Sequence, residues 1–480
     1  MDAIVVRDLR RACGPRELIA SRPGGRPDAG RGHGGVAAPR RPDRTVSPVR
    51  AERVSGADLA FLAMDTGAVP EQFGAVLLLD RPVDAASIVR LLGERAPAVP
   101  RLRQRVRRTP PLCGGPLWAD DGTFDVRRHV RRLACPAPGD RAALLSTVLA
   151  LVTERLPRDR PLWRAALIDG LADGTTALAL VVHHALADGL GGLAVLDALL
   201  DGHPRPPVRR FPQRPPPPSR LAVDAARDRL HALRTMPGAL HRFRAAMSAA
   251  GGRAPEPGPP CSLLARTGPR RAAATVHADL ADVRRRARIH GGTVTTALLI
   301  AVADALGGVL AGRGEAVDAV LMAVPVAGRA AATAGDPGNR VSPLLVRVPV
   351  GGPPGPRIRQ VTADIRARRA LAAGPAPIAV LGAAFRVAAT LGAYRWYGNR
   401  QRRVQTVVTS VRGPDRPVRL GGATVRALLP VVVGGPGNLT VTVQAASYAG
   451  DLAVTVVADP DRCPEFAAAA EAVRAGLAGC

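Results

Sequence analysis

The sequence predicts an α/β protein with two domains, each of which combines strands and helices. Strand-like and helix-like segments alternate in both halves of the chain, which is the pattern of α/β folds. The 480 residues, 47% of them hydrophobic, are enough to build two cores. Between the halves lies "PRPPVRRFPQRPPPPSR", which cannot form regular structure because proline lacks an N–H donor and fixes its own φ angle.

Changes in composition set the expected domain boundaries. Residues 1–52 are rich in Arg, Gly and Pro without periodicity, so we expect a disordered extension. We expect an N-terminal domain over residues 53–205, a proline-rich linker with a basic amphipathic helix over 206–268, and a C-terminal domain over 269–480. The basic segment 219–249 is suited to an anionic lipid surface, although a crossover helix packed on the protein itself is the interpretation we favour.

The N-terminal half shows a clear order of elements. Ser55 is expected to cap a short helix, and Asp84 a second one. Within "TTALALVVHH" (175–184), the expected strand 176–183 is apolar at nearly every position, as in a strand that is covered on both faces. The other expected elements are strands at 75–80, 124–130 and 162–169, and helices at 140–156 and 189–201.

The C-terminal half repeats the mixture. We expect strands at 272–280 and 319–326, helices at 280–291 and 293–311, and a hairpin formed by 438–447 and 451–459. The apolar run 297–312 is interrupted by Asp304 and is too short to span a bilayer. Charged residues run through the N-terminal segment, so no secretory signal is expected.

The net charge of +28 does not by itself indicate a nucleic-acid partner. Every basic residue is arginine, and Ala, Gly and Pro are abundant, so a general compositional bias explains the charge. No nucleic-acid motif accompanies it, and we expect no nucleic-acid partner. The absence of lysine excludes a Walker-type phosphate loop and a Schiff-base lysine. The cysteines are dispersed without a CxxC pair, so we expect a reducing, cytoplasmic location.

Two adjacent histidines, His183 and His184, end the expected strand at 175–184. Neighbouring strand residues point to opposite faces, so both rings cannot reach one metal, and we expect no metal site. A loose GxGxxA beginning at Gly189 lacks the acidic residue and the tight turn of a dinucleotide site. No GxSxG motif indicates a serine hydrolase.

General-base catalysis by one histidine is the remaining chemical interpretation. A neutral imidazole can take the proton of a hydroxyl that attacks a carbonyl. Asp188 stands where the N-cap of the next helix belongs and can bond backbone donors or an arginine, and Gly189 allows the sharp turn into the helix. On spacing alone, a structural histidine pair at a strand end explains the pattern equally well.

The segment His183-His184-Ala-Leu-Ala-Asp188-Gly189 matches HHxxxDG, the motif of a superfamily that includes chloramphenicol acetyltransferase and peptide-synthetase condensation domains. The chain most resembles the bacterial wax ester synthase/diacylglycerol acyltransferases of that superfamily. "VSGADLAFLAMDTG", "FDVRRHVRRLACPAPG", "PLW", "GNRVS", "VVTSVRGP" and "SYAGDLAVTVVAD" resemble successive blocks of those proteins. The resemblance covers about residues 54–205 and 269–470.

The resemblance implies two chloramphenicol-acetyltransferase-like domains with the active site in a tunnel between them. It implies His184 as the base that deprotonates an alcohol, with His183, Asp188 and Gly189 in support, and acyl-CoA as donor without any bound cofactor. The implied acceptor is diacylglycerol or a long-chain alcohol, giving triacylglycerol or wax ester. Unassigned arginines would meet the phosphates of coenzyme A, and contact with the inner membrane face or lipid bodies would be peripheral.

The chain departs from the family pattern at three places. Thr295-Thr296 replaces an Asn-Asp pair, "CSLLARTG" replaces a Leu-Asn-Gly segment, and "TSVRGP" around Ser410 replaces Ser-Asn-Val-Pro-Gly-Pro. These changes bear on the choice of acceptor. Transfer to a polyketide or other secondary metabolite, or a degenerate paralogue that only binds lipid, therefore stays an alternative.

Overall fold

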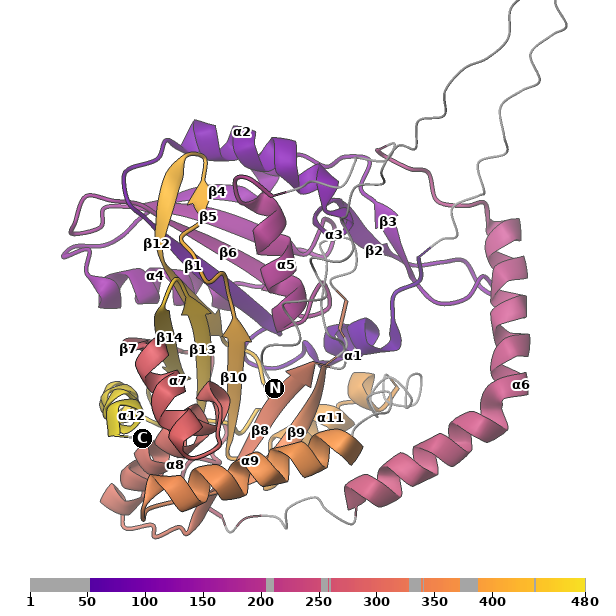
Figure 1. Cartoon of the computed structure of the whole chain (residues 1–480). Helices are drawn as coiled ribbons and strands as arrows, with labels where there is room; N and C mark the ends of the chain where they lie inside the picture. The colour runs from indigo at the N-terminus through magenta and orange to yellow at the C-terminus, as the bar shows by residue number, and fades with distance from the viewer. Residues whose placement is uncertain are drawn as a thin grey trace, which may run out of the picture. The chain divides into compact units, whose positions relative to one another are not determined.

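The computed structural model describes residues 52–203, 211–251, 258, 260–327, 338–339, 341–371, 387–435 and 437–479 (Figure 1). Of the extension expected at 1–52, all but the last residue lies outside this range. The described residues belong to one compact unit, Ala51–Cys480. The expected linker is described in part, and it includes the long helix α6 (Pro218–Gly251).

Two six-stranded sheets dominate this unit. The first has the order β11-β12-β1-β6-β5-β4, and the second has the order β7-β14-β13-β10-β8-β9. The first sheet contains β1 (Gln72–Leu79), β4 (Val130–Ala134), β5 (Trp163–Asp169), β6 (Ala177–His183), β11 (Arg419–Leu420) and β12 (Ala423–Val432). The second contains β7 (Ala272–Asp279), β8 (Ala319–Ala327), β9 (Val341–Pro349), β10 (Thr406–Arg412), β13 (Val441–Tyr448) and β14 (Asp451–Ala458). A small ribbon pairs β2 (Gln104–Arg107) with β3 (Leu117–Asp120).

Helices cover the sheets. They are α1 (Gly56–Met64), α2 (Ala85–Arg95), α3 (Pro100–Arg103), α4 (Arg141–Thr153), α5 (Gly189–Leu199), α7 (Leu280–Ile289), α8 (Val294–Gly312), α9 (Pro354–Leu371), α11 (Ala393–Gly398) and α12 (Phe466–Gly479), with short 3₁₀ turns at Ala96–Ala98 and Val126–Arg128. Ser55 and Asp84 cap α1 and α2, as predicted. The prediction of a strand at 124–130 is wrong. Asp125 caps the 3₁₀ turn Val126–Arg128, and the strand β4 begins only at Val130.

Strand β6 occupies the middle of the first sheet and is buried at every position. Leu178, Leu180 and Val182 pack into the core that includes residues of α2 and α5. On the other face, Ala179 and Val181 pack into the core that includes residues of α4. The prediction of a strand covered on both faces is confirmed, and the strand brings His183 rigidly to its end.

A segment from the C-terminal half completes the first sheet. Strand β12 pairs antiparallel with β1 from Phe73↔Val432 to Leu79↔Val425. Figure 1 shows these two strands, drawn at opposite ends of the colour scale, lying side by side. The division expected between 53–205 and 269–480 is therefore crossed by β11 and β12, because β12 pairs with the N-terminal strand β1 and carries β11 with it.

Helix α8 is the one described helix that is long and apolar enough to cross a membrane, with 19 residues and a mean hydropathy of 2.0. It starts earlier than the apolar run that we expected to be too short, because Thr293 caps it. Its residues from Thr296 to Ala303 are buried in the core beneath the second sheet. The apolar character of α8 is thus explained by its position in the protein core.

Candidate active site

The histidine pair lies at the end of β6, followed by a short turn and α5. Asp188 has extended backbone angles, and its side chain accepts a hydrogen bond from the Gly191 N–H at 2.8 Å. Its carbonyl accepts from the Gly192 N–H at 2.7 Å. The predicted N-cap is confirmed, and Asp188 holds the turn that carries His184.

The hydrogen bonds of His183 define its protonation state. Its Nδ1 lies 2.9 Å from the Ala185 backbone N–H, which can only donate. Nδ1 must therefore accept, so the proton of the neutral ring is on Nε2. Nε2 faces Asp65 Oδ2 at 3.3 Å, where it donates. His183 is thus locked as a neutral donor and cannot also serve as a base toward substrate.

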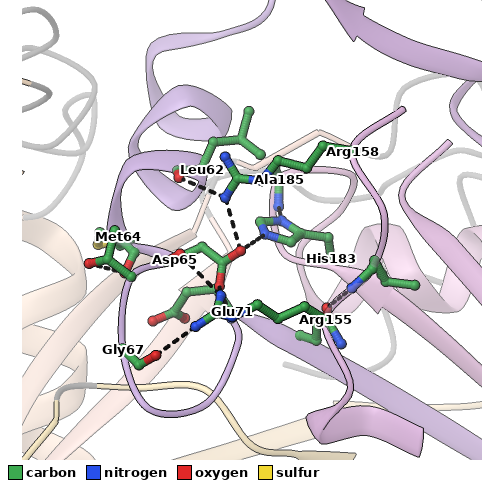
Figure 2. A network of polar contacts seen from close by, with 12 residues as sticks. Leu62, Met64, Asp65, Gly67, Glu71, Arg155, Arg158, His183 and Ala185 are labelled. Atoms are coloured by element: carbon green, nitrogen blue, oxygen red, sulfur yellow. Dashed lines mark hydrogen bonds and ion pairs between the residues drawn. The ribbon is translucent and has the colours of Figure 1, made fainter. Parts of the chain in front are cut away.

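Asp65 is the centre of a buried polar network (Figure 2). It caps the end of α1 and accepts from Arg155, from Arg158 at 3.0 Å and from the Glu71 N–H at 3.1 Å, besides its contact with His183. Burial alone would raise the pKa of Asp65, but the hydrogen bonds from His183 and Arg158 and the charge of Arg155 hold it well below its usual range. Asp65 is therefore an anion that orients His183.

The ring of His184 is placed between two phenyl rings. Its centroid lies 5.0 Å from that of Phe61, which is stacked on it, and 4.6 Å from that of Phe73, which is tilted. The side chain is only partly exposed, and burial is the main reason that the pKa of His184 falls to about 3. In the part of the chain that the structure describes, no group hydrogen-bonds to the ring nitrogens. His184 is therefore a neutral imidazole whose nitrogens are available to a ligand.

Close packing sets the position of these rings. A Cβ atom added at Gly192 would lie 2.7 Å from the Phe73 ring, so only glycine permits this approach. Phe61 comes from α1, which the same Asp65 terminates. The backbone N–H of His184 donates to the Glu71 carbonyl at 2.9 Å, just before Phe73 in the chain. Three separate segments thus hold one imidazole.

The C-terminal half also reaches the site. The Asn339 side-chain N–H groups donate to the His184 carbonyl at 2.5 Å and to Asp58 of α1 at 2.8 Å. A Cβ atom at Gly189 would lie 3.8 Å from Val411 of β10. One residue from each of the "GNRVS" and "TSVRGP" blocks, Asn339 and Val411, therefore lies near the HHxxxDG turn.

A cavity of about 270 Å³ opens beside this turn. Its walls come from the segments 64–71, 266–271 and 394–399 and from residues 435 and 437, and His184 is not among the described lining residues. The buried side chain of Glu71 lines it, and burial together with the charge of Asp65 raises the pKa of Glu71 to about 7. Glu71 connects the cavity to the HHxxxDG turn, because its carbonyl accepts a hydrogen bond from the His184 N–H.

Two of the departures from the family pattern have different surroundings in the structure. Thr296 is buried and forms a capping box with Thr293 at the start of α8, with the Thr293 N–H donating to Thr296 Oγ1 at 2.7 Å. Ser410 is exposed on β10.

Among the described residues, no cluster of three or more His, Cys, Asp or Glu side chains is arranged to hold a metal ion.

The structure brings His183, His184, Asp188 and Gly189 together, which their closeness in sequence made certain. Sequence reasoning missed Asp65, Arg155, Arg158, Phe73 and Asn339 as partners of the histidines. Asp65 lies 118 residues before His183, and no spacing rule connects them. The quoted block "GNRVS" was the one available signal for Asn339.

Comparisons with known proteins place this geometry in context. Residues 54–298 match the model of the wax ester synthase/diacylglycerol acyltransferase catalytic domain, and residues 337–479 match the C-terminal domain of that family. A Mycobacterium tuberculosis protein named as the diacylglycerol O-acyltransferase tgs1 is 32% identical over 417 residues, covering 81% of this chain and 86% of the relative. A second M. tuberculosis protein named as a diacylglycerol O-acyltransferase is 29% identical over 457 residues, covering 86% and 87%.

Two solved structures have a similar fold. The wax ester synthase/diacylglycerol acyltransferase of Marinobacter aquaeolei has a TM-score of 0.61 at 21% identity, covering 89% of this chain and 98% of that one. The first condensation domain of the calcium-dependent antibiotic synthetase has a TM-score of 0.60 at 18% identity, covering 90% and 96%. The predicted fold class, mixed sheets with helices of the acetyltransferase type, is confirmed.

Proposed function

Because this chain belongs to the wax ester synthase/diacylglycerol acyltransferase family, a family of acyltransferases, we propose that it esterifies diacylglycerol or a long-chain alcohol with the acyl group of acyl-CoA. The products are triacylglycerol or wax ester. The observation that carries the proposal is the neutral ring of His184, held between Phe61 and Phe73 with its nitrogens unbonded within the described structure.

In the proposed reaction, His184 takes the proton of the acceptor hydroxyl as its oxygen attacks the thioester carbonyl. The new C–O bond forms, the C–S bond breaks, and the coenzyme A thiolate takes the proton back from the imidazolium. A pKa of about 3 keeps His184 unprotonated but makes it a weak base in the empty site. Proton transfer therefore has to accompany C–O bond formation, which makes the hydroxyl more acidic.

The supporting residues act through position. His183 donates to Asp65 and accepts from Ala185, so it fixes the turn without exchanging protons with substrate. Asp188 caps α5 and holds the other end of the turn. Holding two substrates against one imidazole supplies much of the rate in reactions of this kind.

The names of the relatives support diacylglycerol as the acceptor, because both mycobacterial proteins carry the name diacylglycerol O-acyltransferase. The proposed location is the cytoplasm, with peripheral attachment at the inner membrane face or at lipid bodies, where such acceptors reside. Acyl-CoA and the acceptor are the proposed partners.

The experiment is acyl transfer by the purified chain with radiolabelled palmitoyl-CoA and a panel of acceptors. The panel contains diacylglycerol, hexadecanol and hydroxylated polyketides. We expect labelled triacylglycerol or wax ester, and a loss of about 10²-fold or more in His184→Ala. His277→Ala, a partly exposed histidine on β7, is the matched control and should keep full activity.

Each outcome decides something. Unchanged turnover in His184→Ala overturns its role as base. Product from the polyketides alone would replace the lipid acceptor, and no product with any acceptor, despite binding of the acyl chain, would mean a lipid-binding protein.

A further inference from the structure

Four exposed apolar side chains gather around helix α11. Val387, Leu391, Trp396 and Tyr397 are 58%, 80%, 61% and 51% exposed. Elsewhere in the described structure, Leu112 and Ile289 are exposed singly, which is ordinary for a protein surface, and Val223, Leu230 and Leu233 are exposed along α6. Four within one short stretch form a patch that requires an explanation. We call these four residues the α11 patch.

Arginines without a described ion-pair partner lie close to the α11 patch in the sequence. The segment 387–403 contains four arginines, Arg395, Arg400, Arg402 and Arg403, and no Asp or Glu. All four are exposed, and none has a carboxylate within ion-pair distance among the described residues. The Arg400 guanidinium lies 5.2 Å from the centre of the Trp396 ring. Tryptophan and tyrosine beside arginine are the side chains that favour the interface between lipid headgroups and acyl chains.

The same helix forms one wall of the cavity beside the catalytic turn. Tyr394, Arg395 and Gly398 of α11 line this cavity, and Glu71 lines it as well. The Glu71 carbonyl in turn bonds the backbone of His184. A surface that binds the α11 patch would therefore lie next to the cavity.

We propose that the α11 patch docks the protein on an anionic lipid surface, with its aromatic and aliphatic side chains in the interface and its arginines against the headgroups. Docking there places the cavity at the source of a lipid acceptor. The supply of a lipid acceptor to the cavity rests on the proposed function, whereas the docking on the lipid surface does not. Each arginine near an anionic surface strengthens binding about fivefold.

Helix α6, the segment in which the sequence suggested lipid contact, fits this role less well. Val223, Leu230 and Leu233 are exposed along it. Near the N-terminal end of this helix, however, Arg227 pairs with Asp224, and Asp228 pairs with Arg53. The positive charge of α6 is thus partly neutralised, in contrast to that of segment 387–403.

Tryptophan fluorescence can report docking directly. Of the three tryptophans, Trp118 and Trp163 are 4% and 1% exposed, and Trp396 is 61% exposed. On addition of vesicles of phosphatidylcholine with phosphatidylglycerol, we expect a blue shift of the emission and its quenching by brominated lipid. Vesicles of phosphatidylcholine alone should give a much smaller change. In Trp396→Phe the shift should vanish while co-sedimentation with vesicles persists.

Variants test whether the α11 patch carries the binding. We expect Leu391→Ser/Trp396→Ser and Arg400→Gln/Arg402→Gln/Arg403→Gln each to lower vesicle partitioning about tenfold or more. Ile289→Ser removes another exposed apolar side chain, 73% exposed on α7, and should bind like the unmodified protein. Leu230→Ser/Leu233→Ser tests α6 and should also leave binding unchanged.

The readouts separate docking from catalysis. Partitioning needs no turnover, so it tests docking even if the proposed acyl transfer is wrong. Both patch variants should keep activity toward a short-chain, water-soluble alcohol and lose it toward diacylglycerol in vesicles. Unchanged partitioning in both patch variants, or loss in the α6 variant alone, would overturn the proposal.

Discussion

The raised pKa of Glu71 predicts that ionisation of this residue destabilises the folded chain. Its side chain is 8% exposed, lies near the anionic Asp65 and has a pKa raised from the ordinary 4.5 to about 7. A carboxyl group that binds its proton more tightly in the folded chain stabilises the fold below pH 4.5. That stability is lost as the pH rises toward 7, because the unfolded chain ionises first.

The magnitude follows from the shift. Each pKa unit corresponds to about 1.4 kcal/mol, so ionised Glu71 should destabilise the folded chain by about 3 kcal/mol at pH 8. Glu71→Gln keeps the size of the side chain and an oxygen acceptor but cannot ionise. We expect this variant to be more stable than the unmodified protein by up to about 3 kcal/mol at pH 8, with the difference disappearing near pH 4.

Urea denaturation followed by circular dichroism at pH 4 and pH 8 measures this difference. Glu154→Gln is the control, because Glu154 pairs with Arg131 and Arg164 and has a lowered pKa. That variant should gain no stability at pH 8. An equal stability difference for Glu71→Gln at both pH values would refute the electrostatic reasoning, since a packing effect does not depend on the ionisation of residue 71.

Three further outcomes are expected. The acid limb of kcat/KM should lie below pH 5, because the pKa of His184 is about 3; a midpoint near 6.5 in a pH–rate profile would contradict this. Asp65→Asn should lower the free energy of unfolding by about 1–2 kcal/mol, a modest loss because the arginine partners of Asp65 are about half exposed. The same variant should lower kcat, because His183 loses the carboxylate that positions it. An unchanged urea midpoint would argue against the stabilising role of the network. Gly192→Ala should displace the Phe73 ring, which a Cβ would approach to 2.7 Å, and reduce kcat more than it changes the melting temperature; wild-type kcat would show that Phe73 does not position His184.

Local chemistry made much of the HHxxxDG turn predictable. Asp188 caps α5 because a carboxylate placed just before a helix meets its free N–H groups, whatever the rest of the chain does. The uninterrupted apolar run of β6 required cover on both faces. These features depend on residues within one or two turns of one another, so periodicity and composition are sufficient to find them.

The partners of the histidines could not be found in this way. Asp65 and Asn339 meet the turn from 118 and 155 residues away, and only the folded chain brings them there. Strand β12 could have extended either sheet, and its apolar pattern does not say which edge it pairs with. The sequence around Gly192 does not predict that the Phe73 ring packs against this glycine.

The sequence by itself determined the presence of an imidazole at the end of a buried strand, the cap that follows it and the mixed α/β class, because these arise from short-range hydrogen bonding and from the burial of apolar side chains. The tertiary structure alone decided that His183 is a locked donor, that His184 is a neutral ring between two phenyl rings, and that α11 exposes an aromatic, arginine-rich surface beside the cavity. Protonation state and exposure depend on neighbours from distant segments, and those neighbours exist only once the chain has folded.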